Sequence, residues 1–276
     1  MDMNWLEGIL YGLLSGIAEF VPVSAQAHKA ILRQLLGANG KLPLMELFIH
    51  MGVLAALIVC INEQIHRLYR EYQLRRNSRR RRRAPDRQSS ADISLLKTAC
   101  VPLILGFVFY AATSRMTEKL YIVAIFLLLN GILLYIPLHV PTGNKDARTM
   151  SKLDSLFIGI LSMASVLPGI SRIGMCCSAS VLRGAEPKQA YRWGLFLSIP
   201  ALAIMCCFDI YDVFVAGFGG MGMTVFLQCV LSGIMAYIGA FFTIKLVRSL
   251  ALRVGLFNLS YYCWGAALFA FILYLI

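Results

Sequence analysis

The chain has 276 residues, of which 59% are hydrophobic and 14% are charged. Soluble domains are nearer 45–50% apolar and about 25% charged, so this composition excludes a soluble protein and indicates one whose solvent is lipid. A transmembrane helix needs about 20 mostly apolar residues, and a chain of this length has room for roughly six to eight of them.

The formal net charge of +12 is distributed unevenly. Ten arginines and three acidic residues lie between Glu63 and Arg87, so this stretch carries more than half of the excess. A basic chain can indicate nucleic acid binding. Arginines gathered in one loop, however, are typical of a cytoplasmic loop that follows the positive-inside rule, and they attract anionic lipid headgroups. We therefore expect the bilayer as a partner and no nucleic acid.

The cysteines do not indicate a metal cluster, and the first residues do not indicate a cleaved signal peptide. All eight cysteines lie in apolar stretches, none forms a C-x-x-C pair, and no His stands at zinc-ligand spacing. We expect neither a disulfide framework nor a zinc site. The segment Met1–Trp5 lacks the basic region of a cleavable signal peptide, so the first apolar segment is expected to remain in the protein.

The first two apolar segments are short and are separated by a proline. Trp5–Phe20 is followed by Pro22, and Ser24–Leu36 ends at a glycine. Neither segment is long enough to span a bilayer alone, so the pair is predicted to form one kinked span or a re-entrant hairpin. Leu42–Ile61 is the first predicted full span.

A hydrophilic stretch, residues 62–90, separates this span from the rest of the chain. Its run Arg75–Arg83 is typical of a disordered or surface-bound segment, because like charges repel one another. Further full spans are predicted at Ile93–Ala112, Leu120–Val140, Trp193–Val215, Thr224–Val247 and Leu256–Ile276. Two short helices, Leu156–Leu167 and Arg172–Arg183, flank Pro168. All segments are predicted to be helices, because lipid-exposed strands would leave unpaired edges.

The two short, proline-broken pairs resemble each other. Gly-Leu-Leu-Ser begins at Gly12, twelve residues before Ser24. Gly-Ile-Leu-Ser begins at Gly159, twelve residues before Ser171. Matching broken helices in two halves indicate an inverted-repeat fold with its site where the repeats meet. We predict one membrane domain, 1–276. Residues 1–140 form the first repeat, with an Arg-rich cytoplasmic loop at 63–91, and 150–276 form the second.

Few ionisable residues lie in apolar surroundings, where charge is costly and usually functional. Glu19 ends the first short helix, His28 follows the first break, and Arg172 follows the second. Two further pairs are weaker candidates for functional residues. Glu46 and His50, four residues apart, either bond each other or serve a site. Asp209 and Asp212 end a span, where solvation at the interface is the favoured interpretation.

These residues suit an anion that carries phosphate. The two breaks leave helix N-termini near Ser24 and Ser171, and helix N-termini favour anions. Arg172 adds a fork of donors that matches phosphate oxygens. Glu19 can act as a base or hold a cation such as Mg²⁺, and His28 is a natural proton carrier. Glu19 and His28 also have structural interpretations. Glu19 could form an ion pair with Arg172, and His28 could be a core residue bonded to a carbonyl.

Two segments resemble the signatures of the bacterial undecaprenyl-pyrophosphate phosphatases. The first is Gly16-Ile-Ala-Glu-Phe-Val-Pro-Val-Ser-Ala-Gln-Ala-His28 and the second is Pro168-Gly-Ile-Ser-Arg-Ile-Gly174. The segment Glu46–Gly52, the chain length and the basic loop fit as well. The resemblance implies an all-α fold of interlocked inverted repeats with re-entrant helices. It also implies hydrolysis of undecaprenyl diphosphate to the monophosphate, which recycles a lipid carrier for cell-wall synthesis.

The resemblance further implies the residues of the site. By position, Glu19, His28 and Arg172 match catalytic residues, with Glu19 also holding a divalent cation, Mg²⁺ or Ca²⁺. Matching residues for substrate binding and the loop frame are Ser24, Ser171, Gly169 and Gly174. The implied setting is a multi-pass protein of the bacterial plasma membrane, with a polyprenyl diphosphate as partner and a second copy in a homodimer.

Several positions depart from the family pattern. The family has a second Glu one turn before Glu19, where this chain has Ser15, and a second Ser after Pro-Val, where it has Ala25. Gln26-Ala27 stands for the usual Thr-Gly. The loss of a carboxylate weakens cation binding, and an alanine cannot attack phosphorus, so Ser24 or a water would have to be the nucleophile.

Two alternatives to the phosphatase remain open at this level. A non-enzymatic carrier could use the same phosphate site to move a polyprenyl phosphate across the bilayer by alternating access. A regulatory protein could anchor a partner through Arg75–Arg83, with Glu19 and Arg172 as no more than an ion pair. We favour the phosphatase, with the carrier second.

Overall fold

The computed structural model describes residues 4–37, 43–76, 86–141, 143–217, 222–250 and 254–276. Over these ranges the chain is helical and contains no strand beyond an isolated bridge between Lys145 and Ala185. Six of the described helical segments are long and apolar enough to cross a membrane. The prediction of an all-α polytopic membrane protein is therefore confirmed.

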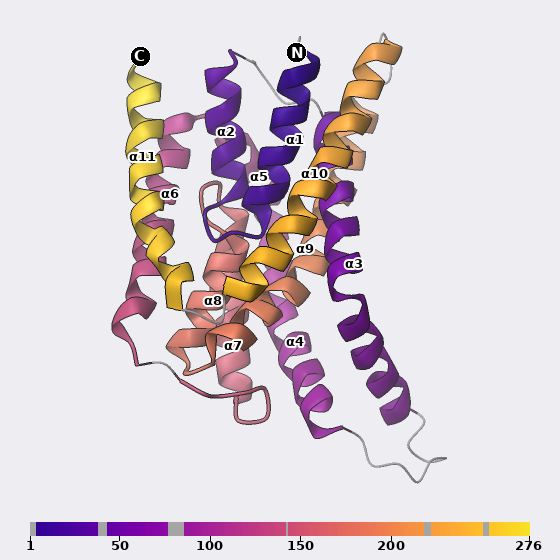
Figure 1. The fold of residues 1–276 in the computed structure, drawn as a ribbon, viewed down its shortest axis with the longest axis vertical. Helices are drawn as coiled ribbons and strands as arrows, with labels where there is room; N and C mark the ends of the chain where they lie inside the picture. Colours follow the sequence, from indigo (N-terminus) through magenta and orange to yellow (C-terminus); the bar gives the residue numbers. More distant parts are fainter. Residues whose placement is uncertain (1–3, 38–42, 77–85, 142, 218–221, 251–253) are drawn as a thin grey trace.

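The long helices form the walls of the bundle (Figure 1). They are α3 (Pro43–Arg76), α4 (Arg87–Gly106), α6 (Leu120–Tyr135), α9 (Pro187–Ala216), α10 (Met223–Leu250) and α11 (Leu259–Leu275). Short 3₁₀ segments extend three of them. η2 (Phe107–Phe109) joins α4 to α5 (Tyr110–Met116), η3 (Ile136–His139) follows α6, and η5 (Val254–Asn258) precedes α11.

The four remaining helices form two hairpins that enter the bundle from opposite ends (Figure 1). α1 (Trp5–Glu19) and α2 (Ala25–Leu35) occupy the half that holds both termini. α7 (Lys152–Met163), with η4 (Ala164–Val166), and α8 (Arg172–Leu182) occupy the other half. Each hairpin turns near the middle of the molecule, at the two prolines that interrupt the apolar runs.

Local sequence explains where these short helices begin. α1 starts with a capping box in which Asn4 and Glu7 bond each other's backbone, and α7 starts with the same arrangement of Ser151 and Asp154. Such boxes satisfy N–H groups that the helix leaves unpaired. α1 then ends at Glu19, because Pro22 fixes a backbone that cannot continue the helix.

The sequence predicted a loop for the hydrophilic stretch after the first span, but part of this stretch is helical. α3 continues to Arg76, with a non-helical backbone at Ile61 where the apolar run ends. Hydropathy reports where the helix leaves lipid, not where it ends, so the predicted loop 63–91 contains the end of α3 and the start of α4. Most of the run Arg75–Arg83 lies outside the described residues.

Small residues let each hairpin pack against a helix from the other half of the chain. α1 packs against α10, where Gly12 and Gly16 lie directly on the backbone of Ser232 and Ala236. α7 packs against α4, and Gly159 leaves no room for a Cβ beside Ala99. Close backbone approach through small residues is the usual basis of helix association in lipid. The boundaries of the two repeats, 1–140 and 150–276, stay a prediction.

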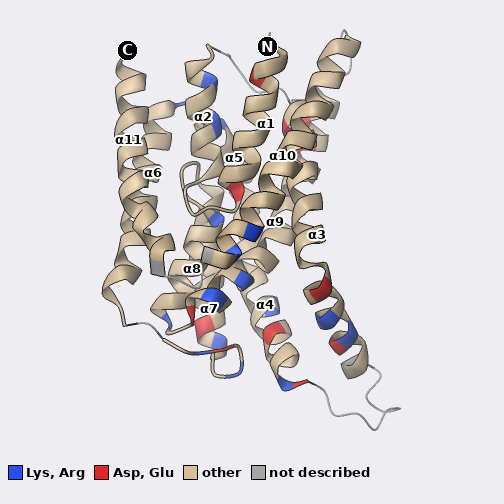
Figure 2. Ribbon diagram, viewed as in Figure 1, with Lys and Arg blue, Asp and Glu red and all other residues tan. Residues whose placement is uncertain are grey.

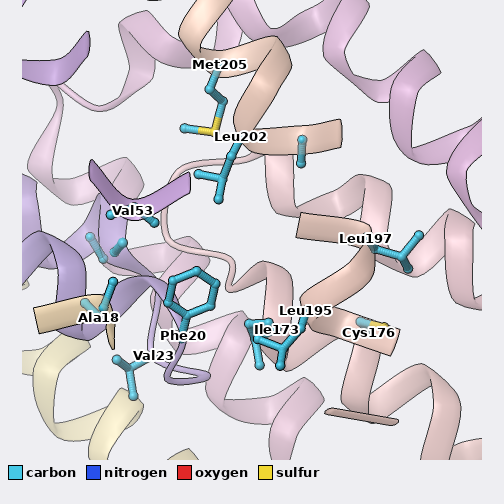
Figure 3. Packing of buried hydrophobic residues seen from close by; sticks show 14 of the residues in the cluster. Ala18, Phe20, Val23, Val53, Ile173, Cys176, Leu195, Leu197, Leu202 and Met205 are labelled. Atoms are coloured by element: carbon cyan, nitrogen blue, oxygen red, sulfur yellow. The ribbon is translucent and has the colours of Figure 1, made fainter. Parts of the chain in front are cut away.

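The buried core surrounds the turn of the first hairpin. Phe20, which is fully buried, lies among side chains contributed by α1, α3, α8 and α9 (Figure 3). Its carbonyl oxygen accepts a hydrogen bond from the hydroxyl of Tyr191 on α9. The turn is therefore held in place by packing from four helices, which fixes the residues on either side of it.

Charged residues concentrate at the end of the bundle opposite the termini, on the lower parts of α3, α4 and α7 (Figure 2). At this end Asp92 on α4 accepts hydrogen bonds from Arg192 and from the indole of Trp193 on α9. Asp154 on α7 accepts one from Arg183, just beyond α8. A smaller set of charges lies within the bundle, and these surround the candidate site.

Candidate functional site

The turns of the two hairpins meet, and one side chain joins them. Asn130 on α6 is fully buried. Its Nδ2 donates to the carbonyl oxygen of Pro22 at 3.1 Å, and its Oδ1 accepts the backbone N–H of Ser171 at 2.8 Å. The hydroxyl of Ser171 also donates to the carbonyl oxygen of Val21 at 3.4 Å. The starts of α2 and α8 are thus held beside each other.

Both turns have backbone conformations that require particular residues. Ser24, the N-cap of α2, has φ 67° and ψ 101°, a left-handed conformation that L residues rarely adopt. Gly169 has φ +108°, and a Cβ there would lie 2.7 Å from the carbonyl oxygen of Val123 on α6. A backbone outlier that surrounding packing maintains is a feature of functional sites.

Glu19 and Arg172 form a buried ion pair across the two turns. The Nη1 of Arg172 lies 2.8 Å from Oε1 of Glu19, and the two side chains are 7% and 10% exposed, respectively. Nη2 lies 3.0 Å from the sulfur of Met205, and Nε is buried without a hydrogen-bond partner among the residues that the structure describes. An arginine with two nitrogens that lack an oxygen partner can accept an anion without losing its ion pair.

A small cavity opens on this ion pair. The residues that line it are Glu19, Ser24, Ala25, Gln26, Ser165, Ile170, Ser171, Arg172 and Met205. It contains four of the seven predicted site residues. The other three, His28, Gly169 and Gly174, lie outside its lining. Gly169 packs on α6, and the N–H of Gly174 donates to the hydroxyl of Ser171, which caps α8.

His28 faces α11 and not the ion pair. Its Nδ1 lies 2.8 Å from the carbonyl oxygen of Ser24 and its Nε2 lies 2.7 Å from the hydroxyl of Tyr262, on which the ring is stacked. A carbonyl only accepts, so Nδ1 carries the hydrogen, and a neutral ring then accepts from Tyr262 at Nε2. A catalytic role for His28 stays a prediction.

Comparison of the sequence with known proteins identifies its family. The family described as bacitracin resistance protein BacA matches residues 8–269. The chain belongs to the BacA family. A protein of Alkaliphilus metalliredigens named undecaprenyl-diphosphatase is 26% identical over 275 residues, which cover 95% of this chain and 96% of the relative. One of Methanobrevibacter smithii with the same name is 27% identical over 277 residues, covering 98% and 97%.

The residues of this BacA family member fit a divalent cation only in part. Over the described residues, no group of three or more His, Cys, Asp or Glu is arranged to hold a metal ion. Ser15, one turn before Glu19, donates to the carbonyl oxygen of Tyr11 and offers no carboxylate. Mg²⁺ can bind through one carboxylate together with substrate phosphates, and Glu19 is the carboxylate that meets this requirement.

Sequence reasoning missed a second buried charge cluster beside the site. Lys29 on α2 lies 2.6 Å from Oε2 of Glu46 on α3, and Arg33 lies 3.7 Å from Oε1 of the same carboxylate. The hydroxyl of Tyr11 on α1 donates to Glu46 at 2.5 Å. One carboxylate therefore joins α1, α2 and α3. We call Tyr11, Lys29, Arg33, Glu46, His50 and Asp209 the polar network.

The structure decides one open alternative about this network and corrects one expectation. Glu46 and His50, for which mutual bonding and a role in a site were both left open, do not bond each other, because Lys29 lies between them, 3.5 Å from Nε2 of His50. Asp209 is not solvated at the interface. It is 6% exposed and lies 2.5 Å from Nδ1 of His50. The partners come from α2 and α9, so only tertiary packing, and no spacing along the sequence, identifies them.

The sequence does contain a signal that buried charges exist here, although it does not identify their partners. Lys29 and Arg33 are four residues apart on α2, on one helix face with Gln26, and both are buried. Basic residues at helical spacing next to a proline-broken turn require a buried acid, which Glu46 supplies. Asn130 gave a weaker signal, a single amide within an otherwise apolar predicted span.

Proposed function

We propose that this protein hydrolyses a polyprenyl diphosphate, undecaprenyl diphosphate, to the monophosphate and inorganic phosphate. One observation carries the proposal. The buried Glu19–Arg172 pair lines a cavity between two helix N-termini, and two nitrogens of Arg172 have no oxygen partner there. Membership of the BacA family and relatives named undecaprenyl-diphosphatase support the same activity.

Arg172 binds the terminal phosphate in this mechanism. Its Nε and Nη2 donate to phosphate oxygens, and the positive ends of α2 and α8 add to the attraction. Phosphoryl transfer depends mostly on positioning and on stabilising the charge of the transition state. Donors held in place by Asn130 and by the N-caps Ser24 and Ser171 provide that stabilisation without reorganising during the reaction.

A divalent cation is proposed to join Glu19 when the substrate is bound. When present, it would neutralise charge on the phosphate oxygens. Only Oε1 of Glu19 is used by Arg172, so the other carboxylate oxygen is left for the cation or for a proton.

The cavity leaves two candidate nucleophiles, Ser24 and a water, and the unpartnered amide oxygen of Gln26 favours the water. Ser165 donates its hydrogen to the carbonyl oxygen of Ser162, and Ser171 donates to that of Val21. Ala25 has no hydroxyl, which leaves Ser24 as the serine with an uncommitted hydrogen. Gln26 lines the same cavity, and its Oε1 is buried without a partner. This oxygen can accept from a water and orient it, as glutamines do in other phosphoryl-transfer sites.

The step balances with residues already present. The water oxygen attacks the terminal phosphorus, and the bond from that phosphorus to the bridging oxygen breaks. The polyprenyl monophosphate leaves with the electron pair of that bond. One hydrogen of the water passes to the carboxylate of Glu19, and the other stays on the inorganic phosphate.

The carrier alternative is not favoured. The relatives that cover nearly the whole chain carry the name of a hydrolase. The cavity also contains a carboxylate beside the arginine. A hydrolytic step uses this carboxylate, whereas in a protein that only binds an anion it would weaken the binding.

The experiment that tests the function is phosphate release from undecaprenyl diphosphate by purified protein in detergent, with Mg²⁺ or Ca²⁺. We expect turnover, and a loss of about two to three orders of magnitude in Arg172→Gln. The matched control is Arg183→Gln, near the other end of α8, where the side chain is half-exposed and paired with Asp154. Folded wild-type protein without turnover, or equal losses in both variants, would contradict the proposal.

The setting is proposed as the bacterial plasma membrane. The charged ends of α3, α4 and α7 suit the cytoplasmic side by the positive-inside rule (Figure 2). The two hairpin turns, and the site between them, then lie near the middle of the membrane (Figure 1). A homodimer stays a prediction, which ultracentrifugation in detergent would test.

A further inference from the structure

Two consecutive residues of α11 contact the first hairpin turn and the helix that follows it. The hydroxyl of Tyr262, in the first turn of α11, lies 2.7 Å from Nε2 of His28 on α2. The thiol of Cys263 lies 3.8 Å from the carbonyl oxygen of Pro22. The cavity of Glu19 and Arg172 is lined by other segments of the chain. An effect of α11 on the site must therefore pass through this turn.

The hydrogens in the contact between α11 and α2 follow from the chemistry of its atoms. The carbonyl oxygen of Ser24 only accepts, so Nδ1 of His28, 2.8 Å away, carries a hydrogen and donates it. In the neutral ring Nε2 is then an acceptor, and the hydroxyl of Tyr262 donates to it. The hydrogen bonds run in one direction, from Tyr262 through the imidazole to the backbone of Ser24.

Ser24 is the residue whose conformation needs this support. Its φ of 67° and ψ of 101° lie in a region that costs an L residue about 1–3 kcal/mol and that persists only where the surroundings maintain it. The Ser24 carbonyl accepts the backbone N–H of His28 at 3.3 Å as well as Nδ1, and the Ser24 hydroxyl oxygen accepts the N–H of Ala27 at 3.4 Å. The bond from the imidazole, at 2.8 Å, is the shortest of the three.

The orientation of the Ser24 carbonyl reaches the site through one peptide group. This carbonyl and the N–H of Ala25 belong to the same planar unit and point in opposite directions. Ala25 is the first residue of α2, where the helix leaves its N–H groups without an intrahelical partner, and both residues line the cavity of Glu19 and Arg172. Fixing the carbonyl therefore fixes a donor at the start of α2.

We propose that Tyr262 is a positioning residue for the hydrolysis, and that His28 links it to the Ser24–Ala25 peptide instead of acting as an acid or base. This inference rests on the proposed function and deepens it. Both ring nitrogens of His28 are already used, Nδ1 by Ser24 and Nε2 by Tyr262, so neither is left for a water or a phosphate oxygen. The ring also faces α11 and not the ion pair.

The first test removes one hydroxyl. Tyr262→Phe keeps the ring that stacks on His28, with centroids 5.7 Å apart and planes 6° apart, and loses only the donor. We expect kcat for undecaprenyl diphosphate to fall at least about tenfold, with KM and melting temperature close to those of the wild type. The matched control is Tyr261→Phe, the same change at the adjacent, exposed position, which should keep wild-type kcat. Wild-type kcat in Tyr262→Phe would overturn the inference.

The second test separates positioning from acid–base chemistry at His28. In His28→Asn the amide nitrogen takes the place of Nδ1, so the bond to Ser24 is kept without a titratable group. In His28→Gln the amide takes the place of Nε2, and the bond to Ser24 is lost. We expect the Asn variant to retain at least about tenfold more kcat than the Gln variant, with the limbs of the wild-type pH–rate profile. Equal losses, or a limb missing in His28→Asn, would show an acid or base and overturn the inference.

A third measurement does not depend on turnover. The chain has four histidines, and the spectrum of His28→Asn identifies the ¹⁵N signals of His28 in protein labelled at histidine. We expect a neutral ring protonated at Nδ1, with an Nε2 signal that moves in Tyr262→Phe and not in Tyr261→Phe. A hydrogen on Nε2, or a signal that does not move, would overturn the link. If the wild type has no turnover, the proposed function fails, and these signals still decide whether Tyr262 holds His28.

Discussion

The side-chain oxygen of Asn130 accepts the backbone N–H of Ser171 at 2.8 Å, and through its nitrogen the same amide holds the carbonyl oxygen of Pro22. These two contacts connect turns that are about 150 residues apart in the sequence. They are made by a fully buried residue of a third helix. The relative position of Glu19 and Arg172, one on each side of this junction, therefore depends on a residue that touches neither of them.

Asn130→Ala is expected to reduce turnover strongly while the protein stays folded. The change leaves the Ser171 N–H and the Pro22 carbonyl without these partners, and each unsatisfied buried group costs about 1–3 kcal/mol. A shift of the two turns relative to each other should lower kcat by at least about tenfold. Phosphate release and thermal unfolding in detergent measure the two effects.

The matched control for this change is Asn258→Ala, at an exposed position before α11. It should alter neither quantity. Wild-type kcat in Asn130→Ala would show that the junction does not position the site.

Much of the fold was predictable because its signals are local. Long apolar runs predicted the spans, and Pro22 and Pro168 predicted two broken hairpins, since proline removes a backbone donor whatever surrounds it. Glu19 and Arg172 were predictable as a pair, because few charges lie in apolar surroundings and each is costly alone. The length of α3 beyond Ile61 was not predictable, because a hydrophilic helix outside lipid has no hydropathy signal.

The polar network was not predictable in the same way. Asp209 lies 159 residues from its partner His50, and its position at the end of a span fits solvation equally well. Lys29 follows His28 in the sequence yet faces a different side of α2, toward Glu46 and not toward Tyr262. Which face of a short helix meets which neighbour is decided by packing, and a single sequence does not contain that information.

Gln26→Ala is expected to lower kcat by about tenfold to a hundredfold and to leave KM within about twofold. The amide orients the attacking water and does not bind phosphate, so its loss affects the chemical step. Gln34→Ala, on the exposed side of the same helix, is the control. Acid quenching with a substrate labelled in the terminal phosphate should yield no phosphoenzyme, and label on Ser24 would show that the serine is the nucleophile.

Asp86→Asn is expected to change the pH dependence of stability at the start of α4. Asp86 caps this helix, and hydrogen bonds from the Ser89 hydroxyl and from the N–H groups of Gln88 and Ser89, with Arg67 nearby, lower the pKa of its carboxyl. A lowered pKa contributes stability that is present above the unfolded value of about 3.9 and is lost as pH falls through the folded value. Wild type should exceed the variant in melting temperature at pH 7, and the difference should shrink below about pH 4. A difference that is constant with pH would show that the cap does not require the charge.

Lys29→Met is expected to destabilise the protein by up to about 3–5 kcal/mol, because it removes the closer cation of the buried Glu46 and leaves Arg33, 3.7 Å from Oε1, as the remaining one. Removing the charge as well should recover much of this loss, since a neutral amide at position 46 needs no counter-ion. The double variant Lys29→Met, Glu46→Gln should therefore be more stable than Lys29→Met alone. Unfolding in a denaturant series of the wild type, the two single variants Lys29→Met and Glu46→Gln, and the double variant gives the coupling free energy between the two sites. A coupling near zero would mean that the 2.6 Å contact contributes nothing to holding α2 against α3, and that the position of Gln26 and Ser24 is set by packing alone.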